Sequence, residues 1–186
     1  MKRAAGFSEA ENKRDALALA GMLDKLNTLP QLTIARVHGA AMGGGLGLVS
    51  CCDIAIAAPE AVFALSEVKL GLIPATIGPY VIHAIGQRQA RRFFQTGERF
   101  SAQKAYEIGL VHELAESGKI DDVLLRILEE LGKNGAQAMR AAKRLCFDLA
   151  GSAVPDSVKN DTAARIATIR TGTEAQGRLK AFLEKR

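Results

Sequence analysis

The stretch that decides the fold is VHGAAMGGGLGL, residues 37–48. The stretch begins extended and apolar, passes through a glycine-rich bend and ends in the start of a helix. Glycines suit the bend because they allow a sharp turn and a close approach to the main chain. The first N–H groups of such a helix have no intrahelical partner and lie at the positive end of its dipole. They suit a phosphate or the oxyanion that develops on a reacting carbonyl. Tight packing between helix and strand explains the same glycines equally well.

Short extended runs surround this stretch, at residues 33–38, 54–58 and 62–65. The run at 54–58 is nearly all apolar, which is typical of a strand covered on both faces. Before these runs, Ser8 and Glu11 form a capping-box pattern that opens a helix, and Pro30 closes that segment. The pattern predicts the α/β class.

From residue 75 onward the pattern is helical. Helices are predicted at residues 75–85, 88–96, 121–132, 135–150, 156–170 and 174–185, and one more begins after Ser101 and stops at Gly109. Residues 110–112 form a short extended return, and 70–74 a loop. Three or so strands are too few for a parallel sheet with both faces covered. Either further strands come from elsewhere, or the chain lacks its N-terminal part.

Composition excludes several classes of protein. Of the 186 residues, 48% are hydrophobic and 24% charged, which excludes intrinsic disorder, and no apolar run approaches the roughly 20 residues of a membrane span. The net charge of +5 is dispersed, with no Trp and only 2 Tyr, which argues against nucleic acid and suits a phosphate-bearing ligand. Three cysteines without metal-ligand spacing predict buried thiols, no metal site and a cytoplasmic, reducing location.

Glu67 is the candidate acid–base residue. It lies in LSEVKLGLIP, residues 65–74, directly after a predicted strand. Apolar surroundings favour the protonated carboxyl and suit a general acid or base near neutral pH. The alternative is a solvated carboxylate paired with Lys69. Asp53 is expected to be a structural hydrogen-bonding residue, and the three scattered histidines receive no role.

The order of these motifs resembles the crotonase (enoyl-CoA hydratase/isomerase) superfamily. The matching stretches are VHGAAMGGG at 37–45, CDIAIA at 52–57, FALSEVKLGLIP at 63–74, TGE at 96–98, AQKA at 102–105, GLV at 109–111 and AFLEKR at 181–186. They cover almost the whole chain in one register. Within the superfamily, GLVSCCD at 47–53 and LSE at 65–67 look most like methylglutaconyl-CoA hydratases.

The resemblance implies a crotonase-like fold of stacked β-β-α units. Residues 1–74 would be the C-terminal part of the core, and residues 75–186 a helical oligomerisation region that completes the acyl-CoA site. The N-terminal strands of the family would be missing, so the resemblance leads us to expect an N-terminally truncated chain. It also implies an acyl-CoA thioester substrate, no other cofactor, and a homotrimer or hexamer. Gly44 would supply an oxyanion-hole N–H, and Glu67 would match the family's catalytic glutamate. Substrate and CoA contacts would come from Met42, Gly43, Gly45, Ser66, Pro74, Phe182 and Lys185.

Two positions depart from the family pattern. The best-known hydratases carry a second glutamate where this chain has Gly47, and a glycine-rich stretch where it reads ATIGPY, residues 75–80. Glu67 would then act alone, with another acid, or with a carboxylate of the substrate. The leading hypothesis is a hydratase for a branched or dicarboxylic enoyl-CoA. The alternatives are a single-glutamate enoyl-CoA isomerase and an inactive, oligomer-forming or RNA-associating fragment.

Overall fold

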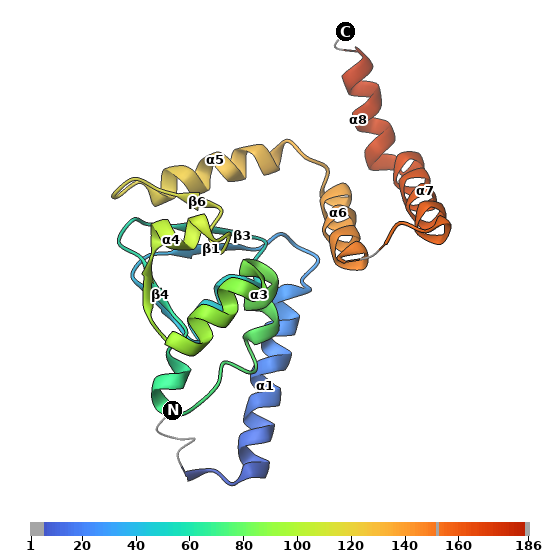
Figure 1. The fold of residues 1–186 in the computed structure, drawn as a ribbon. Helices are drawn as coiled ribbons and strands as arrows, with labels where there is room; N and C mark the ends of the chain where they lie inside the picture. Colours follow the sequence, from blue (N-terminus) through green and yellow to red (C-terminus); the bar gives the residue numbers. More distant parts are fainter. Residues whose placement is uncertain (1–5, 152, 185–186) are drawn as a thin grey trace. The chain divides into compact units, whose positions relative to one another are not determined.

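A computed structural model describes residues 6–151 and 153–184 of the chain (Figure 1). By their contacts, the residues divide into two units. Of the described residues, 6–29 and 33–128 form the first unit, and 30–32, 129–151 and 153–184 form the second. The sequence analysis divided the chain at residue 74 into a part of the core and an oligomerisation region. That division by role stays a prediction.

The first unit is α/β, as predicted. Its elements are α1 (Glu9–Asn27), β1 (Ile34–Val37), β2 (Ala40–Met42), α2 (Gly44–Cys51), β3 (Ile54–Ala57), β4 (Val62–Ala64), the 3-10 helix η2 (Ser66–Leu70), α3 (Gly78–Thr96), β5 (Arg99–Ser101), α4 (Ala102–Glu107), β6 (Glu113–Leu114) and most of α5 (Ile120–Gly132). The capping box at Ser8 and Glu11 opens α1, and Ser101 accepts a hydrogen bond from the Lys104 N–H at the start of α4. Both helix starts therefore follow the sequence signals.

Two three-stranded sheets form the frame of this unit. In the first, β3 lies between β1 and β6, and all three strands are parallel. In the second, β4 pairs in parallel with β2 and antiparallel with β5. The strand β5 was not expected, because its three residues, Arg99–Ser101, carry no period long enough to read. The return at residues 110–112 was placed slightly early, since the paired residues are Glu113 and Leu114.

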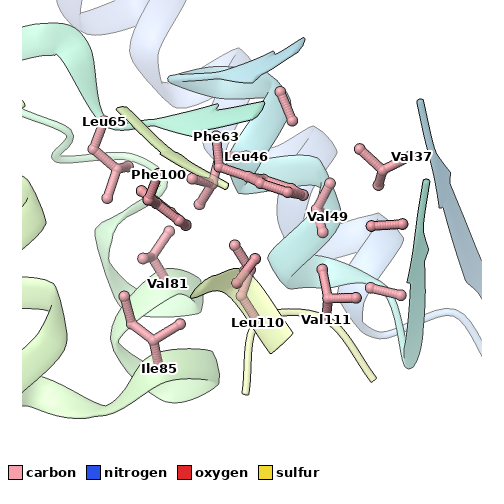
Figure 2. Close-up of a cluster of buried hydrophobic side chains, with 14 of the residues drawn as sticks. Val37, Leu46, Val49, Phe63, Leu65, Val81, Ile85, Phe100, Leu110 and Val111 are labelled. Carbon is pink, nitrogen blue, oxygen red and sulfur yellow. The ribbon is translucent and has the colours of Figure 1, made fainter. Parts of the chain in front are cut away.

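The core of this unit surrounds α2, which packs against both α1 and α3. Figure 2 shows Leu46 and Val49 of this helix among side chains from β4, α3 and β5, including the stacked rings of Phe63 and Phe100. A smaller cluster joins Ile56 and its neighbours to the inner face of α5. The glycine-rich helix is thus held on several sides by apolar contacts.

The second unit consists of the end of α5 together with α6 (Ala136–Leu149), α7 (Asp156–Thr171) and α8 (Thr173–Glu184). Glu174 of α8 accepts hydrogen bonds from the N–H groups of Gln137 and Ala138, and so caps α6. Asp148 of α6 forms salt bridges with Arg144 and with Arg165 of α7. No described residue of α6, α7 or α8 is buried, so polar contacts contribute much of what joins these helices.

The structure shows how far two of the three cysteines are buried. Cys51 is buried, as expected, but the expectation was wrong for Cys146, which is exposed on α6, a helix without a buried face. Burial raises the pKa of the Cys51 thiol to about 12.

Among the helices of the described residues, none combines the length and the apolar character that a bilayer crossing requires.

Candidate active site

The site forms where two neighbouring parallel strands end. Met42 and Ala64 are register partners at the ends of β2 and β4, so the chain leaves both strands at the same edge of the sheet. Ligands of α/β sheets bind at this carboxyl edge. The glycine bend follows β2, and η2, which carries Glu67, follows β4. Parallel pairing therefore brings together two motifs that are more than 20 residues apart.

The glycine bend turns at Gly43, whose φ is +50°. Its N–H donates to the carbonyl of Ala64 at 2.9 Å, which ties the bend to the end of β4. The first i→i−4 hydrogen bond of α2 runs from the Gly47 N–H to the Gly43 carbonyl. Because the first helical N–H groups have no partner within the helix, those of Gly44 and Gly45 remain available at the positive end of α2.

Glu67 lies directly against this bend. An ideal Cβ placed on Gly43 would be 2.9 Å from Glu67 Oε1, so only glycine leaves room for the carboxylate here. Glu67 Oε2 is buried and has no hydrogen-bond partner in the described part of the chain. Buried polar atoms are nearly always hydrogen-bonded, so an unpartnered acceptor marks a place where water or substrate is expected to bind. The alternative pairing with Lys69 is absent from the salt bridges of the described residues.

A cavity of about 300 Å³ surrounds the carboxylate. The structure lines it with six of the predicted residues, Met42, Gly43, Gly44, Ser66, Glu67 and Pro74, and with four others, Leu19, Ile73, Thr76 and Ile77. Glu67 is the one ionisable residue among the described residues that line it. Gly45 does not line it, Phe182 lies on α8 in the second unit, and Lys185 lies outside the described residues.

Two of the lining residues that the sequence did not indicate, Leu19 and Ile77, look like ordinary apolar residues in the sequence. Leu19 belongs to the regular apolar stripe of α1, which predicts core packing as readily as a site. Ile77 lies in the ATIGPY segment, where the departure from the family pattern was the one available signal.

Gly47 has a packing role rather than a binding role. A Cβ at this position would lie 2.3 Å from Ile77 Cγ2 and 2.8 Å from Ile77 Cβ. The side chain of Ile77 is almost wholly buried, at 2% exposure. Both explanations of the glycine stretch therefore hold, each for a different residue: Gly43 admits the carboxylate, and Gly47 admits Ile77.

The other polar residues singled out in the sequence are structural. Asp53 Oδ2 accepts hydrogen bonds from the N–H and the hydroxyl of Thr33, at 2.8 and 2.9 Å, which joins the starts of β1 and β3. His112 Nδ1 accepts from the Ala55 N–H at 3.0 Å, so its proton is on Nε2. Neither residue lines the cavity around Glu67.

Comparison with known proteins gives the family. The family model described as "Enoyl-CoA hydratase/isomerase" matches residues 2–186. The chain belongs to the enoyl-CoA hydratase/isomerase family. The match confirms the predicted superfamily, and with the solved relatives it confirms the crotonase-like α/β fold.

Solved relatives align closely with this chain. The crystal structure of an enoyl-CoA hydratase from Shewanella pealeana has a TM-score of 0.95 and 44% identity, with 100% of this chain and 69% of that chain covered. An enoyl-CoA hydratase/isomerase from Marinobacter aquaeolei has a TM-score of 0.89 and 34% identity, covering 97% and 69%. Among the curated relatives, enoyl-CoA hydratase AKT6-1 of Alternaria alternata is 36% identical over an alignment that covers 69% of this chain and 44% of that protein.

Proposed function

We propose that this chain hydrates an α,β-unsaturated acyl-CoA thioester, with Glu67 as its acid–base residue. The observation that carries the proposal is the buried, unpartnered Glu67 Oε2 beside the free N–H groups that begin α2. A proton acceptor and an oxyanion site then face one cavity. Membership of the family is consistent with an acyl-CoA substrate.

The proposed reaction needs one carboxylate. Glu67 takes a proton from a water molecule as the water oxygen bonds to Cβ of the substrate. The electron pair of the double bond moves onto the thioester oxygen, and the Gly44 N–H stabilises the resulting enolate. The protonated Glu67 then delivers its proton to Cα, which restores the carboxylate and completes the 3-hydroxyacyl thioester. No cofactor beyond the CoA of the substrate takes part.

The contact between Gly47 and Ile77 supports a second candidate as well, because an isomerase also works with one carboxylate. Because Ile77 fills the space beside Gly47, a second carboxylate at that position has no room. An enoyl-CoA isomerase needs one base, which removes a proton from one carbon and returns it to another. Glu67 alone can do this with the same enolate stabilisation.

Several finer expectations accompany the proposal. Methylglutaconyl-CoA or a related branched enoyl-CoA is the substrate that the sequence motifs favour, and a dicarboxylic substrate would bring its own second carboxylate. A homotrimer or hexamer, tested by sedimentation, and a cytoplasmic location, tested by fractionation, stay predictions. The N-terminal truncation also stays a prediction, tested by the intact mass of the protein from its own cells.

The test combines one substitution with isotope labelling. We expect Glu67→Gln to lower turnover of an enoyl-CoA by about 10²-fold or more while the circular dichroism spectrum is unchanged. Glu60→Gln, at an exposed glutamate between β3 and β4, is the matched control and should keep full turnover. In H₂¹⁸O, a hydratase yields a labelled 3-hydroxyacyl product, whereas an isomerase yields a product without label. Full activity of Glu67→Gln would remove Glu67 from the mechanism.

A further inference from the structure

Helix α8 contacts the turn between α5 and α6 through two charged side chains, Glu174 and Arg178, all within the second unit. These residues are four positions apart, so they share one face of α8. The Glu174 carboxylate accepts hydrogen bonds from the N–H groups of Gln137 and Ala138, at 3.0 and 3.1 Å. These bonds hold the pKa of the Glu174 carboxyl below its ordinary 4.5, so the group is charged at neutral pH.

Arg178 binds the other side of the same turn. Its Nη1 donates to the Lys133 carbonyl and its Nη2 to the Asn134 carbonyl, each at 2.7 Å. These carbonyls directly follow α5, which ends at Gly132. A negative charge therefore lies at the positive end of α6 and a positive charge near the negative end of α5, which is the favourable arrangement for both helix dipoles.

Gly135 lets both side chains reach the turn. It is the N-cap of α6 and offers no side-chain hydrogen bond to that helix. A Cβ at this position would lie 2.8 Å from Glu174 Cδ and 3.2 Å from Arg178 Nε. Gly135, Glu174 and Arg178 thus form one fitted contact, which we call the catch.

Apolar packing adds little to the catch. No described residue of α6, α7 or α8 is buried, and Leu179 and Leu183 of α8 are 46% and 65% exposed. Segments with few buried apolar contacts open at low free energy, separately from the rest of a protein. The charged hydrogen bonds of the catch are therefore a large share of what holds α8 on the turn.

A single residue, Gly172, separates α8 from α7, which ends at Thr171. The Gly172 N–H donates to the Ile169 carbonyl and so closes α7, while its own backbone is extended, with φ of −68° and ψ of 152°. Hinges are a few residues at the ends of elements that absorb a change in backbone dihedral angles. Rotation at Gly172 would move α8 without breaking either helix.

We propose that α8 is a strap that opens about Gly172 and closes on the turn between α5 and α6, where Gly135, Glu174 and Arg178 catch it. Opening exposes the first N–H groups of α6 and the carbonyls that follow α5. The helices α6 and α7 stay joined, because Asp148 keeps its salt bridges with Arg144 and Arg165. This device is independent of the reaction proposed at Glu67.

The first test is hydrogen exchange of the full chain at pH 7, followed by peptide mass spectrometry. The amides of α8 should exchange as one block, at least tenfold faster than those of α2. Glu174→Gln and Arg178→Met should each speed exchange of α8 about tenfold or more, because each removes charge-assisted hydrogen bonds. Glu184→Gln makes the same charge change on α8 outside the catch, and should alter exchange of α8 by less than about threefold.

Exchange of α2 in the same samples should stay unchanged, which shows that the variants remain folded. Exchange of α8 in step with α2 in the unmodified protein would overturn the strap. Exchange of α8 at the unmodified rate in both Glu174→Gln and Arg178→Met would overturn the catch.

The second test leaves both charged residues in place. Gly135→Ala should also speed exchange of α8 about tenfold, because the methyl group displaces the flexible ends of Glu174 and Arg178. Gly132→Ala is the matched control, since a Cβ added there meets no atom within 4 Å, and it should leave exchange of α8 unchanged. If α8 exchanges equally slowly in the two alanine variants, Gly135 does not fit the catch and the proposal is overturned.

Discussion

The contact between Gly47 and Ile77 gives a prediction whose size follows from the geometry. In Gly47→Ala the new methyl group would lie 2.3 Å from Ile77 Cγ2, a separation that requires movement of one of the two side chains. Ile77 is 2% exposed in the core around α2, so its freedom to move is small. Overpacking of this kind costs about 1–3 kcal/mol, and the better helix propensity of alanine returns about 0.5–1 kcal/mol. The difference is a net loss of up to about 2.5 kcal/mol, with a middle value of about 1 kcal/mol.

Urea unfolding measures this change, and a second glycine supplies the control. Gly21 lies in α1, is exposed, and has no atom within 4 Å of an added Cβ. Gly21→Ala should therefore stabilise the protein by about 0.5–1 kcal/mol. The Gly47→Ala/Ile77→Ala double variant should show a coupling of about 0.5–3 kcal/mol in the favourable direction, because the trimmed side chain makes room for the methyl group. If Gly47→Ala stabilises the protein as Gly21→Ala does, the packing argument is refuted.

Three further predictions follow from other parts of the structure. Gly43→Ala should lower stability by about 1–2 kcal/mol, because φ at this residue is +50°. It should also lower turnover, because the methyl group would displace Glu67 Oε1. Normal turnover of the variant would exclude that displacement. Burial raises the pKa of Cys51 to about 12, so iodoacetamide at pH 8 should label exposed Cys146 and leave Cys51 unlabelled in peptide mass spectra. Hydrogen bonds from Arg165 and Arg144 lower the pKa of Asp148 below its ordinary 3.8, so the stability that it contributes is present above that value and is lost as pH falls below it. The acid limb of a thermal-unfolding profile should flatten in Asp148→Asn, and an unchanged limb would contradict this assignment.

Much of the fold could be predicted because local signals and packing agree. The capping box of α1, the Ser101 cap and the left-handed Gly97 and Gly109 all lie at element ends, as the sequence indicates. The break at Gly86, with φ of +74°, likewise separates the two helical stretches predicted on either side of it. Strand β5 was missed because it exists only through pairing with β4, a tertiary contact that no local pattern records.

The site was predictable in part for the same reason. Glu67 and the glycine bend were identified from their chemistry, and parallel pairing of β2 and β4 places them together. The apolar lining was not identifiable, because Leu19 and Ile77 look like ordinary core residues in the sequence. The cavity around Glu67 also depends on the course of the segment from Ile73 to Ile77, which has no regular structure before α3 begins at Gly78.

The two positions that depart from the family pattern, Gly47 and the segment that contains Ile77, lie against each other in the structure. This chain has a glycine at residue 47, where the resemblance leads us to expect a glutamate in the best-known hydratases, and it has Ile77 in a segment that we expect to be glycine-rich. The structure places Ile77 in the space that a side chain at position 47 would need. A side chain at position 47 therefore requires that Ile77 move or become smaller.

The contact between Gly47 and Ile77 predicts the effect of placing a glutamate at residue 47. Gly47→Glu alone should fail to fold or should unfold at a lower urea concentration, because it places a charged side chain against buried Ile77. Gly47→Glu/Ile77→Gly should fold with a higher midpoint than Gly47→Glu, since the second change frees the space. If Gly47→Glu is as stable as the unmodified protein, then the contact between Gly47 and Ile77 does not explain why the site has one carboxylate. The single-glutamate mechanism would then need a different structural reason.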